Sequence, residues 1–170
     1  MSDDRPGEDR RPDAASPRDG HDRAGQGRNA TAGGAAAGGT QVRCALVVAE
    51  ELPRWLAANT TAVLGVALGA HGLIPAGPDL EDHEGGRHPG IGTVPLPVLA
   101  APSGELAPLR LKALKLGIVV IDFNEAARNS RTYDEYEKRL STEPIGYLGL
   151  ALHGPKKAIT SVSGNLKSLR

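Results

Sequence analysis

The chain has 170 residues with 20 basic and 20 acidic side chains, so its formal net charge at pH 7 is zero. This length predicts one folded domain. The charge balance disfavours a general affinity for nucleic acid, although it leaves open binding through a local basic patch. No apolar stretch reaches membrane-spanning length without an interruption by Pro, Gly or a polar residue, so we expect no membrane segment.

Residues 1–41 contain no Val, Ile, Leu or aromatic residue, but they hold seven acids and six Arg. Such a segment cannot bury enough apolar surface to offset its chain entropy, which predicts a disordered tail. It lacks the apolar centre of a signal peptide, and its acids are unlike a transit peptide, so we expect a cytoplasmic protein. Residues 42–170, with 14 basic and 13 acidic side chains, form the predicted domain.

Four stretches are predicted to be strands. Three of them are continuously apolar, which is typical of strands buried on both faces. The second stretch contains Pro95 and Pro97, and because proline lacks a backbone donor, this strand is predicted to lie at a sheet edge. The four stretches are 42–49, 92–100, 117–123 and 147–153.

Helical segments follow each of these strands. The first begins at Pro53 and is predicted to end at Gly69, and the second ends at Gly117. Thr132 with Glu135 three residues later forms a capping box for the third. The fourth covers 155–164. Alternating strands and helices predict a mostly parallel sheet with helices on both faces.

Asn59 is an unusual residue for the first helix, whose apolar side chains cover almost the whole circumference. A helix that is apolar all round is predicted to be buried. An unpaired buried amide costs about 1–3 kcal/mol. Asn59 therefore either bonds to a neighbouring loop backbone or faces a cleft at the strand-to-helix turn, where ligands bind in open α/β sheets.

Two further groups of polar residues follow strands. Asp122 and Asn124 end the third strand, where the carboxylate either positions a ligand or caps the next helical turn. Lys156 and Lys157 begin the last helix, and residues 156–170 hold four cations and no acid. These cations either contact phosphates or form ordinary solvated surface.

Other candidate residues receive structural interpretations. Residues 80–90 hold two His and three acids, but their spacing matches no common zinc signature, so we predict a solvated acidic loop and no metal. The single Cys44 is predicted to be a small buried hydrophobe. Tyr133 and Tyr136 are expected to pack on the sheet edge. No glycine-rich phosphate loop follows the first strand, so we expect no cofactor.

The end of the chain, GLALHGPKKAITSVSGNLKSL, resembles the end of type 2 peptidyl-tRNA hydrolases, and LAAN at 56–59 resembles their Ile-Ala-Ala-Gln stretch. The finer pattern, LPRWLAANTTAVLGVALGA with GPDLED, HPGI and ARNSRTYDEYEKRL, resembles a bacterial family of unknown function (DUF2000) related to these hydrolases. The resemblance spans residues 42–170. It implies a three-layer α/β/α sandwich with a four-stranded mixed sheet whose last strand is antiparallel.

The resemblance also implies a cleft formed by the starts of the first and last helices and the end of the third strand. Asn59 would replace the hydrolase Gln there, while Trp55 stands where those hydrolases have a Lys. The candidate catalytic residues are Asn59, Asp122 and Arg54. The candidate ligand-binding residues are Thr60, Asn124 and Lys156.

Three functional hypotheses follow. The first is a domain that binds a small molecule or peptide, or an enzyme of unidentified reaction, without the usual tRNA activity, because the hydrolase Lys is missing. The second is a hydrolase acting on peptidyl-tRNA or a related ester or amide, in which Asn59 orients water and Asp122 or Arg54 assists. The third is a homodimeric protein-interaction module. The sequence leaves open whether the protein is an enzyme.

Overall fold

The computed structural model describes residues 41–170, so the predicted tail lies outside the described range apart from Gln41. None of the helices in this range is long and apolar enough to cross a membrane. The elements, in chain order, are β1 (Val42–Ala49), α1 (Arg54–Ala70), β2 (Leu80–Glu81), β3 (Arg87–His88), β4 (Val98–Ala101), α2 (Ser103–Lys115), β5 (Val119–Asn124), α3 (Glu125–Arg128), α4 (Tyr133–Thr142), β6 (Tyr147–Pro155), α5 (Lys156–Ser163) and β7 (Lys167–Ser168).

Five strands form one mixed sheet in the order β5-β6-β1-β4-β7, and β2 and β3 form a separate two-stranded sheet. β1 runs parallel to β4 and antiparallel to β6, which is also antiparallel to β5. The mixed sheet with β6 antiparallel is therefore confirmed. The mostly parallel sheet expected from the alternating pattern is wrong, because β1 and β4 are the one parallel pair in the five-stranded sheet of residues 41–170. The expected number of four strands is wrong, because Lys167 and Ser168 add β7 beside β4. A two-residue polar strand has no hydropathy period that would predict it.

The proline-containing second strand differs from its prediction. β4 begins at Val98, after both prolines, so neither of them removes a donor from the strand. Pro97 instead contributes its carbonyl, which accepts the Leu46 N–H at 2.9 Å. The predicted edge position is wrong, because β7 pairs with the other side of β4.

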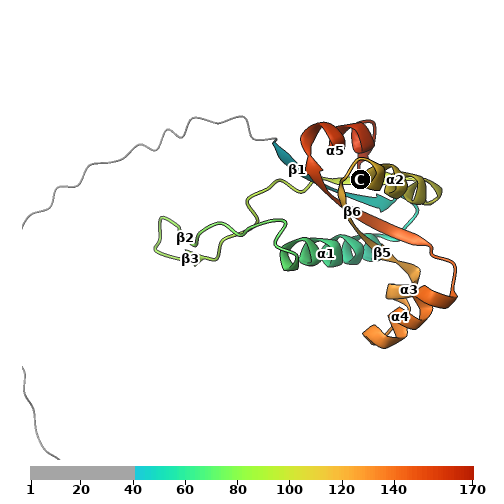
Figure 1. Cartoon of the computed structure of the whole chain (residues 1–170). Coiled ribbons are helices and arrows are strands. Elements are labelled where there is room, and N and C mark those ends of the chain that lie inside the picture. The colour runs from blue at the N-terminus through green and yellow to red at the C-terminus, as the bar shows by residue number, and fades with distance from the viewer. Residues whose placement is uncertain (1–40) are drawn as a thin grey trace, which may run out of the picture. The chain divides into compact units, whose positions relative to one another are not determined.

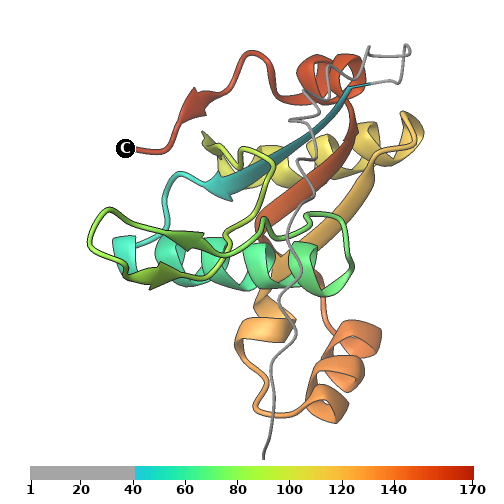
Figure 2. The ribbon, with the colours of Figure 1, turned by 90° about the vertical axis from the view of Figure 1, so that its left-hand side faces the viewer.

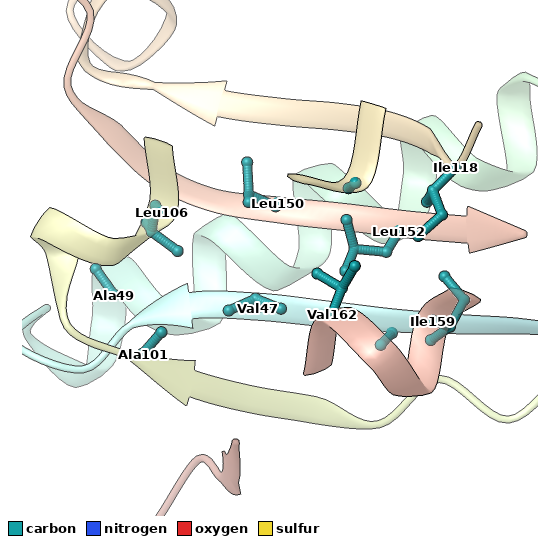
Figure 3. Close-up of a cluster of buried hydrophobic side chains, with 11 residues drawn as sticks. Val47, Ala49, Ala101, Leu106, Ile118, Leu150, Leu152, Ile159 and Val162 are labelled. Carbon is teal, nitrogen blue, oxygen red and sulfur yellow. The ribbon is translucent and has the colours of Figure 1, made fainter. Parts of the chain in front are cut away.

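Helices cover both faces of the sheet, with α1 on one face and α2 and α5 on the other (Figure 1). Alternate residues of β1 divide the core between these faces. Leu46 packs with α1, whereas Val47 packs with α2 and α5. Figure 3 shows the second cluster, in which Val47 and Leu150 from the sheet meet Leu106, Ile159 and Val162 from the helices.

α1 is not buried all round, although its apolar sequence predicts this. Leu56, Leu64 and Leu68 are buried against the sheet, but the side chains of Trp55 and Val66 are 63% and 73% exposed. The reason is that α1 forms an outer layer, so only one of its sides meets the sheet.

Asn59 lies on the exposed side of α1, so the expectation that its amide is buried is wrong. Its neighbour Thr60 is fully buried and packs against β6. A Cβ atom at Gly149 would lie 2.6 Å from Thr60 Cγ2 and 3.1 Å from the Val47 carbonyl oxygen. The lack of a side chain at position 149 therefore lets α1 lie close to β6.

The predicted helix ends are partly confirmed. Thr132 caps α4, and its hydroxyl accepts the Glu135 N–H at 3.2 Å. Gly117 follows α2 with a φ of 68°, which favours glycine. The predicted end at Gly69 is wrong, because α1 continues to the next residue and Gly72 follows with a φ of 67°.

β5 is the last strand on its side of the sheet in residues 41–170, so one of its edges is free (Figure 2). The register shows which backbone groups lie on that edge. Because Leu46 donates its N–H to Pro97, it bonds toward β4. Successive residues of a strand bond to opposite sides. Val47 therefore bonds toward β6, where its partner is Leu150.

The same alternation continues from β6 to β5. The backbone N–H and C=O of Leu150 bond to β1. Those of the next residue, Ala151, therefore point toward its β5 partner, Ile121. The residues on either side of Ile121 then point away from β6. Val120 and Asp122 consequently present their backbone N–H and C=O groups on the free edge.

Gly149→Ala tests the close approach of α1 to β6. We expect a loss of about 1–3 kcal/mol in unfolding free energy, because the added methyl group overpacks the contact with Thr60. Gly104→Ala in α2 is the control, since a Cβ there would meet nothing within 4 Å. Urea unfolding of both variants gives the comparison. Equal effects at the two sites would contradict the packing described here.

Amide hydrogen exchange tests the register of β5. We expect the Val120 and Asp122 amides to exchange much faster than the Ile121 amide, because only Ile121 donates to β6. NMR-detected exchange of the full chain resolves the three positions. Slow exchange at Ile121 and also at Val120 and Asp122 would show that something covers the edge, and fast exchange at Ile121 would contradict the register.

Candidate functional site

A groove with a volume of about 780 Å³ runs along β5, between α1 and the α3–α4 segment. Val63 and Ala67 of α1 line one side, and Tyr136 of α4 lines the other. Val119–Phe123 of β5 lie between them. Small-ligand sites usually measure about 300–1,000 Å³ and have mainly apolar walls, so the groove has the size and lining of a binding site.

Polar side chains hold the end of β5 beside this groove. Asp122 accepts hydrogen bonds from Arg110 Nε through Oδ2 and from Asn124 Nδ2 through Oδ1, each at 2.9 Å. Asn124 also donates to the Tyr136 hydroxyl at 3.1 Å, and its Oδ1 accepts the Ala127 N–H at 2.9 Å. Asn124 therefore caps α3, and each oxygen of the Asp122 carboxylate accepts one hydrogen bond. The network joins β5 to α2, α3 and α4.

The acid that lines the groove, Asp122, is paired, whereas the cation Arg131 has no acidic side chain as a partner in residues 41–170. Arg110 forms an ion pair with Asp122, so the acid is compensated. Arg131 and His71 also line the groove, and neither forms an ion pair with another side chain in residues 41–170. An anionic group on a ligand would therefore be favoured beside Arg131.

Two tyrosines stand at the α4 side of the groove. The rings of Tyr133 and Tyr136 pack edge to face, with their centroids 5.7 Å apart and an interplanar angle of 84°. Tyr136 reaches the end of β5 through Asn124, as expected for packing on the sheet edge. Tyr133 is 84% exposed, so the same expectation is wrong for its ring. Its exposed face is available to a ligand.

The structure brings together only two of the six candidate site residues, Asp122 and Asn124. Arg54 and Asn59 are exposed on α1 and do not line the groove. Thr60 is buried between α1 and β6, and its hydroxyl has no hydrogen-bond partner among the described residues. The arrangement expected for a hydrolase, with Asn59 orienting water for Asp122, therefore has no geometric support.

Lys156 lies at the opposite end of the sheet from the start of α1. Its backbone N–H donates to the Gln41 carbonyl at 2.8 Å, just before β1 begins, whereas α1 starts after β1 ends. Eight strand residues span about 26 Å. The expected cleft between the starts of the first and last helices is therefore not formed. Because β6 runs antiparallel to β1, α5 begins at the far end.

The acidic loop forms the β2–β3 hairpin. Asp82 accepts hydrogen bonds from the backbone N–H groups of Glu84 and Gly86 and lies 2.8 Å from His88 Nε2. These contacts hold the pKa of Asp82 below its usual value, and the hydrogen bond with His88 has the largest effect. No group of three His, Cys, Asp or Glu side chains in residues 41–170 is arranged to hold a metal ion.

Cys44 is buried in β1, as predicted, and burial raises the pKa of its thiol. The thiol therefore stays protonated, as expected for a small core residue rather than a reactive group.

Sequence reasoning missed most of the residues that line the groove. Val63 and Ala67 look like ordinary core positions of α1, and Arg131 lies in a short connection between two helices. The available signal was the pair of tyrosines in a chain in which aromatic residues make up 3% of the sequence. The groove depends on which strand ends the sheet, and strand order cannot be read from hydropathy.

Comparisons with known proteins agree with this fold. The structure resembles that of a protein of unknown function, Atu0240 from Agrobacterium tumefaciens strain C58, with a TM-score of 0.66 and 19% sequence identity, covering 75% of this chain and 96% of that one. No curated protein matches the sequence. A model of the protein family of unknown function DUF2000 matches residues 42–170. The chain therefore belongs to the DUF2000 family.

Proposed function

We propose that the chain is a ligand-binding domain whose site is the groove along β5. The observation that carries this proposal is the groove of about 780 Å³, with its apolar walls and with Arg131, which forms no ion pair within residues 41–170. An apolar wall removes the body of a ligand from water, and a single cation fixes the position of its anionic group. The ligand is therefore a small molecule or short peptide with an apolar body and one negative charge.

The proposal assigns no catalytic step to the groove. Asp122, the acid that lines the groove, has a structural role, because its carboxylate accepts hydrogen bonds from Arg110 and Asn124 and holds the end of β5. Cleavage of peptidyl-tRNA is therefore not proposed. The relation to type 2 peptidyl-tRNA hydrolases stays a prediction from sequence resemblance.

Binding of anilinonaphthalene sulfonate, an apolar anion whose fluorescence rises in apolar surroundings, tests the site. We expect the folded chain to bind one molecule saturably. Val63→Glu should weaken binding at least about tenfold, because it places a negative charge in the wall of the groove. The matched control is Val66→Glu, on the same helix but outside the groove and 73% exposed, which should bind like the unchanged chain.

Thermal unfolding of both variants shows whether each is folded before binding is compared. Equal losses in the two folded variants would mean that the probe lies on the outer face of α1. Absence of saturable binding to the unchanged chain would also contradict the proposed site.

A further inference from the structure

The free edge of β5 is open to pairing in a way that edge strands usually avoid. Natural edges are protected by proline, lysine, bulges or very short length. β5 has six residues, no proline and no lysine, and its one charged side chain, Asp122, is paired with Arg110. Its irregularity lies at the far end, between Phe123 and Asn124. Its start, Val119–Ile121, is apolar. The part of β5 that lines the groove is thus a regular strand whose outer edge pairs with no other strand of residues 41–170.

The backbone groups on this edge have the spacing that an added strand would need for pairing. Val120 and Asp122 each present one N–H and one C=O outward, as derived from the register. A strand that pairs with β5 would form up to four hydrogen bonds with these two residues. A ligand without backbone-like donors and acceptors would leave these groups to water.

The side chains beside the edge indicate the chemistry of such a strand. Val63 and Ala67 of α1 and, across the groove, Tyr136 of α4 would contact every second residue of an added strand and favour apolar side chains. Arg131 lies at the α3–α4 end without an acidic partner among the described side chains. Charge complementarity therefore calls for a carboxylate at that end of the added strand.

We propose that the groove binds an extended polypeptide segment of a partner protein, which adds a strand to the free edge of β5 and places an acidic side chain against Arg131. This inference rests on the proposed binding function and names the class of its ligand. About five strand residues cover Val119–Phe123, a length of about 17 Å. Backbone pairing supplies the affinity, and the apolar wall and Arg131 supply the selectivity.

The first experiment selects binders for the full chain from a displayed library of random twelve-residue peptides. We expect enriched sequences to alternate apolar and polar residues and to contain an acid. A synthetic peptide of the enriched sequence is then N-methylated at alternate residues in two separate sets. One set should weaken binding at least about tenfold, because it removes the N–H groups that face β5, and the other set should have little effect.

The second experiment locates the peptide on the protein. Binding should slow hydrogen exchange of the Val120 and Asp122 amides. Arg131→Gln should remove the preference of the chain for the acidic peptide over its amide counterpart. Arg87→Gln, in the exposed β2–β3 hairpin, is the control and should keep that preference.

Three results would overturn the inference. The first is the absence of enriched peptides, and the second is binding that neither methylated set weakens. The third is slow exchange of the Val120 and Asp122 amides before any peptide is added, which would mean that a second copy or this chain itself covers the edge. Saturable binding of anilinonaphthalene sulfonate together with any of these results would leave the proposed binding function standing, so the two failures are distinguishable.

Discussion

The antiparallel position of β6 between β1 and β5 is the constraint on which the rest of the structure depends. Because β6 bonds to β1 through one set of alternate residues and to β5 through the other, both of its edges are used. Its direction also decides where α5 begins, at the far end of the sheet from the start of α1. The close contact of Gly149 with Thr60 then fixes α1 on one face of this central strand. The free edge of β5 and the groove beside it follow from the position of β6 and the placement of α1.

The Asp122 network links the end of the edge strand to three helices. One carboxylate links an arginine from α2 to an asparagine that also caps α3 and contacts a tyrosine of α4. The Arg110 guanidinium further lies 5.5 Å from the centre of the Tyr147 ring. These contacts hold β5 in place, although β6 is its one neighbouring strand within residues 41–170. An acid at the end of a strand serves here to build the wall of a site, although its position in the sequence is equally typical of a catalytic group.

The sequence predicted the layers better than the site. Long apolar runs identified β1, β5 and β6, and the capping box of Thr132 and Glu135 identified the start of α4. Both of these signals are local in the sequence. The exposure of Asn59 could not be predicted in this way, since an apolar helix in an outer layer has the same pattern as a buried one. The separation of Lys156 from α1 depends on the direction of β6, which the local sequence does not encode.

A crystallographic screen of small fragments soaked into the full chain tests the central claim most directly, namely that the β5 groove is the functional site. This assignment predicts that bound fragments collect between Val63, Ile121 and Tyr136, with anionic fragments beside Arg131. It would be contradicted by fragments that leave this groove empty and bind only the outer face of α1 or the smaller apolar hollow of about 350 Å³ lined by Gly65, Ile74 and Leu96.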